Sequence, residues 1–226
     1  EPELTSPRQA LQKKNVLRSG NVYTLKDSIV YFNKGMHIIS SPIIIPEGKK
    51  VVMEEGVQLD FINKAFFMSF SPVQITGTKN NKVLITSSDS SAMGFTIIDA
   101  KTQSSLDWVI FKDFNTLSYE GWNLTGAVTF YESDVAISNT QFMENHCEDA
   151  LNIVRSEFTM TNSSILDAFA DGFDTDFASG IIESCKFIRI GNDGVDFSGS
   201  TIEIKNVSID HAGDKGVSGG ESSTLF

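Results

Sequence analysis

Three aspartates near the C-terminal end have a spacing that could perform chemistry. Asp174 and Asp196 are separated by 22 residues, and Asp176 follows Asp174 by two positions. If 22 residues return the chain to the same place in the fold, these carboxylates lie within about 5–7 Å of one another. Crowded carboxylates repel each other, so at least one pKa should be raised. Such a group could bind a hard cation such as Ca²⁺, or supply the acid and base of a glycosidase.

A repeat of 22 residues explains why this separation matters. The segment Asp149–Asn152 recurs at that step as Asp171–Asp174, as Asp193–Asp196 and, more loosely, as Lys215–Ser218. Apolar residues within each repeat lie two positions apart, which is the spacing of a strand, and helical periodicity is absent. Strand, turn, strand and turn within 22 residues predict one coil of a parallel β-helix.

Alternation along the repeated strand assigns its side chains to two faces. The inward row is Leu151, Phe173, Val195 and Val217, and the outward row is Asn152, Asp174, Asp196 and Ser218. Asp176 also points outward. In the preceding strand, the residues predicted to be buried are Phe158, Met160, Ile182, Ile202 and Ile204. We interpret Asp149, Asp171 and Asp193 as turn residues, whereas the outward row fits a functional and a structural role equally well.

A polar column crosses the repeats at one turn, formed by Asn139, Asn162, Ser184 and Asn206. Side chains stacked at the inter-strand spacing can bond to the coils above and below. With this column, residues 30–226 resemble the right-handed parallel β-helix superfamily of pectate lyases and polygalacturonases, whose coils carry an asparagine ladder at such a turn. The resemblance implies an all-β, right-handed solenoid and a polysaccharide ligand.

The order of the motifs resembles the catalytic region of polygalacturonase-type hydrolases. Asp171–Asp174 is followed by Gly191–Asp196 and then by Gly213–Gly220. The resemblance implies that Asp174, Asp196 and Lys215 are catalytic, with Asp214-Lys215 standing where those hydrolases have a histidine. A lyase is the alternative, with Ca²⁺ on Asp174, Asp176 and Asp196 and with Lys215, Arg155 and Arg189 as bases or neutralising groups.

Further residues are candidates for contact with a sugar. Asn152 belongs to the outward row, and Arg155 follows the same strand. Tyr119 and Trp122 lie in an insertion at 116–123, where they could stack on a pyranose face or pack down as a lid over a coil. Both alternatives stay open from the sequence.

Charge is distributed unevenly along the chain. Residues 1–111 contain 12 Lys and Arg and 10 Asp and Glu, a net of +2, so residues 112–226 hold the remaining 6 and 19, a net of −13. An acidic half argues against nucleic acid and against unaided binding of acidic polysaccharides. No apolar run is long enough for a membrane helix. Cys147 and Cys185 fall in different columns of the repeat, so no disulfide is expected.

The segments 125–132 and 213–221 resemble β-helix modules of bacterial envelope and secreted proteins. That resemblance implies a secreted, periplasmic or cell-surface location and further domains in a longer chain. A short helix from Arg8 to Lys14, with Ser6 as its N-cap, is predicted to cover the open first coil. The domains are therefore a cap at 1–29 and a β-helix at 30–226. We expect the β-helix to recognise polysaccharide along its acidic face. The alternatives are an enzyme that also cleaves it, either a polysaccharide hydrolase or a Ca²⁺-dependent lyase, and a scaffold without a ligand.

Overall fold

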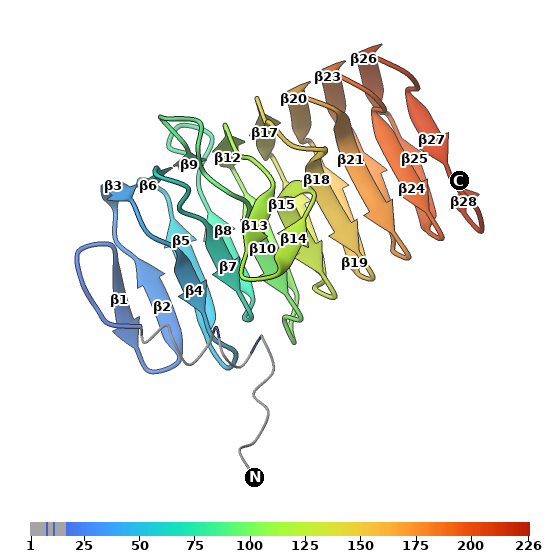
Figure 1. Cartoon of the computed structure of the whole chain (residues 1–226). Coiled ribbons are helices and arrows are strands. Elements are labelled where there is room, and N and C mark those ends of the chain that lie inside the picture. Colours follow the sequence, from blue (N-terminus) through green and yellow to red (C-terminus); the bar gives the residue numbers. More distant parts are fainter. Residues whose placement is uncertain (1–7, 9–10, 12–16) are drawn as a thin grey trace.

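The computed structural model describes Arg8, Leu11 and residues 17–226 as a parallel β-helix of about nine coils. The coils stack in sequence order along one axis, from β1 to β28 (Figure 1). Each coil contributes one strand to each of three sheets, which we name A, B and C in the order that the chain visits them. Neighbouring strands in each sheet pair in parallel, except that β1 pairs with β2 antiparallel.

Sheet A consists of β1 (Tyr23–Lys26), β2 (Ile29–Phe32), β5 (Lys50–Glu54), β8 (Val73–Thr76), β11 (Ser104–Asp107), β16 (Val135–Ser138), β19 (Glu157–Thr161), β22 (Ser179–Glu183), β25 (Thr201–Lys205) and β28 (Thr224–Leu225). Sheet B consists of β3 (Gly35–Ile39), β6 (Val57–Phe61), β9 (Val83–Thr86), β12 (Val109–Lys112), β17 (Gln141–Met143), β20 (Ser164–Ala168), β23 (Lys186–Ile190) and β26 (Ser208–Ala212). Sheet C consists of β4 (Ile43–Ile45), β7 (Phe67–Ser69), β10 (Phe95–Ile98), β15 (Gly126–Tyr131), β18 (Asp149–Val154), β21 (Asp171–Asp176), β24 (Val195–Ser198) and β27 (Val217–Gly219).

The register confirms the 22-residue period. In sheet C, Phe173 pairs with Val195 and Val195 pairs with Val217, so each step along the sheet is one repeat. In sheet A, Val135 pairs with Phe158 across the predicted one-residue insertion. The repeated Asp-Gly segment therefore forms sheet C.

One apolar core runs through the inside of all three sheets. Phenylalanines stack along it, with ring centroids 4.3 Å apart for Phe67 and Phe95 and 5.4 Å apart for Phe111 and Phe142. The residues predicted to be buried in sheet A are buried, apart from one: Phe158, Met160, Ile182 and Ile202 are buried, and Ile204 is half-buried. Val217, which is exposed, lies on β27, the outermost strand of sheet C, and the β25 strand of Ile204 is followed in sheet A only by the two-residue β28.

The polar column occupies one turn, as predicted, between sheets A and B. Asn139, Asn162, Ser184 and Asn206 all have positive φ, from 48° to 55°. The last three are exposed, so the column does not stack toward the interior. Asparagine tolerates the left-handed backbone better than most residues, and this preference explains its recurrence at the turn.

The outer face of sheet C carries a second apolar cluster over the N-terminal coils. Ile44, Phe66 and Phe70 belong to it, and the described Leu11 packs against them. Most of the predicted helix from Arg8 to Lys14 lies outside the described residues. Its described residues, Arg8 and Leu11, contact this outer face: Arg8 bonds to Asp99 at 2.5 Å and lies 4.8 Å from the ring centroid of Phe70. The prediction that this segment covers the open first coil therefore does not hold for them.

Two further elements complete the shell. The insertion predicted at 116–123 forms an antiparallel hairpin of β13 (Leu117–Tyr119) and β14 (Trp122–Leu124), which packs on the same outer apolar cluster. At the N-terminal end, the core is covered by the residues around β1, where Val22, Tyr23 and Leu25 pack against it. Cys147 and Cys185 are both free, as predicted. No helix among the described residues has the length and apolarity needed to cross a membrane.

Candidate functional site

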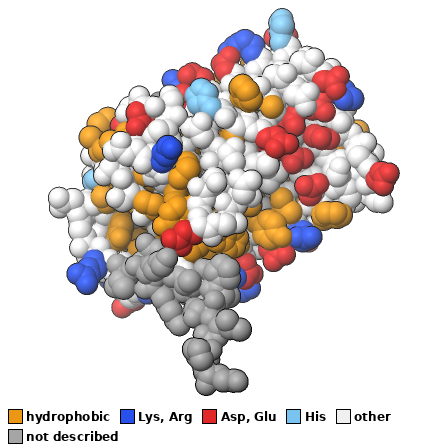
Figure 2. Space-filling view, viewed as in Figure 1, with side chains coloured by type: hydrophobic (Ala, Val, Ile, Leu, Met, Phe, Trp, Pro, Cys, Tyr) orange, Lys and Arg blue, Asp and Glu red, His pale blue; other side chains and the backbone are white. Residues whose placement is uncertain are grey.

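A single outward column of sheet C changes its chemistry along the solenoid. In register, the column reads Ile44, Met68, Thr96, Thr129, Asn152, Asp174, Asp196 and Ser218. We call its acidic part the acidic strip: Asp149, Asp171, Asp174, Asp176 and Asp196, with Asn152, on β18, β21 and β24. Figure 2 shows acidic side chains gathered over these strands, whereas apolar side chains gather over the N-terminal coils.

Asp174 stands in the middle of the acidic strip and is half-buried. The Asn152 side-chain amide donates a hydrogen bond of 2.8 Å to Asp174 Oδ2, and Asn152 is itself buried because the neighbouring strands flank it. Burial, and after it the nearby carboxylates of Asp149, Asp176 and Asp196, together raise the pKa of Asp174 to about 8. Asp174 therefore carries a proton at neutral pH.

Asp176 and Asp196 lie beside it. Asp196 is the register partner of Asp174 on the next strand, and Asp176 lies two residues further along β21. Burial and the charge of Asp196 raise the pKa of Asp176, while the Arg155 guanidinium opposes the rise. Both aspartates are half-buried. The structure thus brings together Asn152, Asp174, Asp176 and Asp196, as the outward row predicts.

Asp149 belongs to the acidic strip although the sequence suggested only a turn residue. Its side chain is 2% exposed, and its Oδ2 has no hydrogen-bond partner among the described residues. Burial raises the pKa of Asp149 to about 7, against a hydrogen bond from Thr125. Ala150 and Leu151 both enter the core, so the strand bends and Asp149 and Asn152 lie on the same outer side. The small residue after each aspartate, Ala150 or Gly172, is the sequence signal for this bend.

Asp171 and Asp193 behave as turn residues, by binding the next coil. Asp171 Oδ1 accepts a bond of 2.8 Å from the Asp193 backbone N–H, and Asp193 Oδ1 accepts one of 2.8 Å from the Lys215 N–H. Asp149 does not continue this series, because the Asp171 N–H donates to the Glu148 carbonyl oxygen instead. The unpaired Oδ2 of Asp149 is thus a departure from the repeat.

Lys215 is placed at the turn before β27, next to carboxylates. Its ammonium group bonds to Asp214 and lies 3.8 Å from Asp193 Oδ2. The hydrogen bond with Asp214 raises the pKa of Lys215 above its usual value. A lysine held in its charged form can neutralise an anion but is poorly prepared to act as a base.

Arg155 lies at the edge of the acidic strip, between two aromatic rings. Its guanidinium carbon is 5.8 Å from the Tyr131 centroid and 5.6 Å from the Phe177 centroid, and its Nη1 donates to the Tyr131 hydroxyl at 2.5 Å. An open pocket of about 270 Å³ adjoins Arg155 and Phe177. Arg189 is held elsewhere, by two bonds of 2.5 and 2.7 Å to Asp167 across strands β20 and β23 of sheet B.

Tyr119 and Trp122 pack downward onto the outer apolar cluster. The Tyr119 ring lies 4.8 Å from the ring of Phe66, and the Trp122 ring lies 6.3 Å from that of Phe70. This is the lid arrangement that the sequence offered as one alternative. Stacking of either ring on a sugar stays a prediction.

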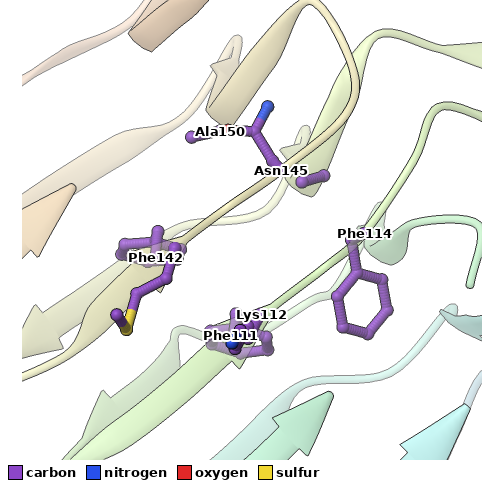
Figure 3. Close-up of a pocket in the computed structure, with 8 residues that line it drawn as sticks. Phe111, Lys112, Phe114, Phe142, Asn145 and Ala150 are labelled. Carbon is purple, nitrogen blue, oxygen red and sulfur yellow. The ribbon is translucent and has the colours of Figure 1, made fainter. Parts of the chain in front are cut away.

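Ligand binding could also depend on a metal site or on a cavity that holds a sugar. Among residues 17–226, no group of three or more His, Cys, Asp or Glu side chains is arranged to hold a metal ion, so the Ca²⁺ expected at Asp174, Asp176 and Asp196 stays a prediction. An interior cavity of about 10 Å³ lies beneath sheet B, between Phe111, Phe142 and Asn145 (Figure 3). That volume suits about one water molecule and no sugar.

Comparisons with known proteins add little to this geometry. No protein-family profile matches the chain, and no curated protein sequence matches it. A solved structure, the catalytic unit of a thermostable GH87 alpha-1,3-glucanase from Streptomyces thermodiastaticus strain HF3-3, is similar with a TM-score of 0.31 and 10% identity. The similarity covers 87% of this chain and 61% of that one. It is too weak to bear on activity.

Proposed function

We propose that the protein binds a polysaccharide along the acidic strip and hydrolyses it, with Asp174 as the general acid. The observation that carries the proposal is the pairing of Asp174 with Asp196 on adjacent strands of one outer face, where burial and the neighbouring carboxylates raise the pKa of Asp174 to about 8. Glycosidases need one carboxylic acid and one carboxylate on either side of the scissile bond. A polysaccharide ligand is in keeping with a secreted, periplasmic or cell-surface location.

The hydrogen bond from Asn152 gives Asp174 a defined proton position. Because the amide donates to Oδ2, we place the carboxyl proton on Oδ1, which leaves Oδ2 as the better acceptor. Oδ1 would protonate the departing glycosidic oxygen, while the Asp196 carboxylate would stabilise the positive charge that develops on the sugar.

The separation of the two strands predicts the stereochemical course. Adjacent strands lie about 4.8 Å apart, which is close to the ~5–5.5 Å between the carboxyl groups of retaining glycosidases and shorter than the ~6.5–9.5 Å of inverting ones. Asp196 would therefore act as the nucleophile, forming a glycosyl-enzyme bond as the glycosidic bond breaks and Asp174 protonates the leaving oxygen. The ionised Asp174 would then take a proton from the water that hydrolyses this intermediate and frees Asp196. Proton NMR of the first product formed should show the anomeric configuration of the substrate, and inversion would instead assign the base role to a more distant carboxylate.

Hydrolysis fits the site better than elimination by a lyase. A lyase needs a base that is neutral before the reaction, and Lys215 is held in its charged form by Asp214. Arg155 is already engaged by Tyr131 and two aromatic rings. A lyase product would absorb in the ultraviolet through its new double bond, so the two reactions are separated by one assay.

The test is an activity and binding screen on neutral, acidic and amino polysaccharides. We expect new reducing ends from at least one substrate, a loss of at least about a hundredfold in rate for Asp174→Asn and for Asp196→Asn, and retained binding in both variants. Asp210→Asn removes an exposed carboxylate from sheet B and is the matched control. Binding without cleavage would leave a recognition module, and neither binding nor cleavage would support a scaffold.

A further inference from the structure

The acidic strip combines a strong excess of negative charge with few positive partners. Five carboxyl groups share the outer face of β18, β21 and β24, and the pKa of Asp174 is raised by four of its neighbours, Asp149, Asp171, Asp176 and Asp196. The two nearby cations are already occupied, Arg155 by Tyr131 and Glu132 and Lys215 by Asp214 and Asp193. A ligand that binds here must tolerate, or neutralise, this charge.

Asp149 gives independent evidence for a missing hydrogen-bond partner. Its carboxyl group is almost fully buried at the floor of the strip, yet Oδ2 meets no hydrogen-bond partner within the described part of the chain. Gly126 occupies the equivalent position on the preceding strand, and a Cβ added there would lie within 2.7 Å of the Asn152 and Thr129 side chains, so this position faces the strip. Buried polar atoms normally have partners, and one without a partner points to a ligand or ion that supplies it.

Aromatic rings at both ends of β21 suggest that this ligand has flat apolar faces. Phe169 precedes the strand and is 71% exposed, and Phe177 follows it and is 63% exposed. The Arg155 guanidinium lies against the Phe177 ring and holds that edge in place. Apolar sugar faces pack on exposed aromatic rings, whereas a bare metal ion would gain nothing from them.

We propose that the acidic strip binds a polysaccharide whose sugars carry free, positively charged amino groups. A protonated amine offers three hydrogen-bond donors and one positive charge, which suits the excess of carboxylates around Asp174 and the unpaired oxygen of Asp149. The pyranose rings would rest against Phe169 and Phe177. The inference rests on the proposed function for the glycan itself and adds the chemistry of its substituents.

The test compares each amino polymer with its own N-acetylated form. Glucosamine and galactosamine oligosaccharides, and the same oligosaccharides after N-acetylation, would be titrated against the full chain by calorimetry at neutral pH and low salt. We expect the free amine forms to bind at least about tenfold more tightly, with an affinity that falls as salt is added.

Variants separate the carboxylates from the fold. Asp149→Asn and Asp196→Asn should each reduce the preference for the amine form about tenfold or more, and Asp210→Asn should leave it unchanged. Circular dichroism checks that each variant is folded. Phe177→Ala should weaken both forms equally, because a ring contact does not read the substituent.

Each outcome decides between the two proposals. Equal affinity for the two forms, or a preference for the acetylated or an unsubstituted polysaccharide, overturns the amine inference and leaves the proposed function standing. Binding of Ca²⁺ that abolishes all preference would assign the strip to a cation instead. No binding to any amino, neutral or acidic polysaccharide overturns both proposals.

Discussion

The two halves of the outer face of sheet C have the same backbone arrangement and differ in the side chains that they carry. Over β4, β7 and β10 the outward residues are apolar apart from Thr96, and the β13–β14 hairpin and Leu11 pack on them. Over β18, β21 and β24 the outward residues are carboxylates, and Phe169 and Phe177 stand exposed beside them. The inner face is the same apolar core in both halves.

This difference shows what each face of a coil is free to do. The inner face must fill a continuous core, so its residue types vary little along the solenoid. The outer face is not needed for stacking, because each coil bonds to its neighbours through the backbone. The outer face of the N-terminal coils binds the β13–β14 hairpin, and the outer face of the C-terminal coils carries carboxylates. We expect the ligand on the face where the protein supplies no cover of its own.

The largest effect should come from breaking the shared core. Met160→Asp places a charge in the completely buried interior of β19 and should destabilise the C-terminal coils by more than about 4 kcal/mol. Urea denaturation followed by circular dichroism measures this. Thr159→Asp, on the exposed side of the same strand, is the control. If the two variants unfold alike, the division into inner and outer faces is wrong.

A smaller loss of stability is expected when a buried side chain is removed from the hairpin that packs on the outer apolar cluster. Leu117→Ala removes a fully buried side chain from the outer cluster and should cost about 3 kcal/mol. Ser118→Ala, at the exposed neighbouring position of β13, should cost little. Thermal melts give the stability and the glycan titration gives the affinity. Because the outer apolar cluster and the acidic strip are separate, Leu117→Ala should lower stability and leave glycan affinity unchanged. A clear fall in glycan affinity would show that the two halves of the outer face are not independent.

The contribution of Asp174 to folding stability should fall as pH rises, whereas that of an aspartate with a lowered pKa would increase. The pKa of Asp174 is about 8 in the folded protein and near 3.9 when unfolded. The folded state therefore holds the proton more tightly, so its stability is greatest below about pH 4, is lost as pH rises toward 8, and is level above that.

Asp174→Asn removes this loss. We expect the variant to be more stable than the wild type by about 3 kcal/mol at about pH 9, a value reduced by the partial exposure of the carboxyl, and equal to it at about pH 4. Melting curves at several pH values measure the difference. A constant difference across this pH range would show that the carboxyl titrates normally.

The smallest effect concerns Ca²⁺. Relief of the repulsion between Asp174, Asp176 and Asp196 should let millimolar Ca²⁺ stabilise the folded form by about 0.5 kcal/mol. The double variant Asp174→Asn with Asp196→Asn should lose this response, which differential scanning calorimetry can resolve. Equal responses in the two proteins would attribute the effect to general screening.

The sequence predicts much of this fold because a solenoid repeats its constraints. The 22-residue step sets the register, so Asp174 and Asp196 were expected on adjacent strands and are found there. The same alternation predicts the burial of Met160 and Ile182. The N-terminal coils are less regular, so their sequence does not repeat the same constraints. The packing of the β13–β14 hairpin and Leu11 over the outer apolar cluster therefore could not be predicted from it.

The site was predicted less completely, for local reasons. Alternation by two fails where Ala150 and Leu151 both enter the core, and this bend carries Asp149 to the outer side. The turns that hold Phe169 and Phe177 do recur with the period, with Gly191 and Gly199 at the equivalent positions one coil later, but the period does not predict that a phenylalanine there is exposed. For Asn162 and Asn206 the shared turn was predicted, whereas the positive φ that favours asparagine there was not, and the stacking of their amides between coils stays a prediction.

The direction of the bonds between coils has a mechanical consequence. In each sheet the backbone hydrogen bonds join one coil to the next, so they point along the rod. A force that pulls the two ends apart would load a few of these bonds at a time, at the outermost coil. We expect the rod to unwind stepwise under tension, releasing about 70 Å of chain for each 22-residue coil. A protein anchored at one end would then lengthen in small increments before its centre gave way.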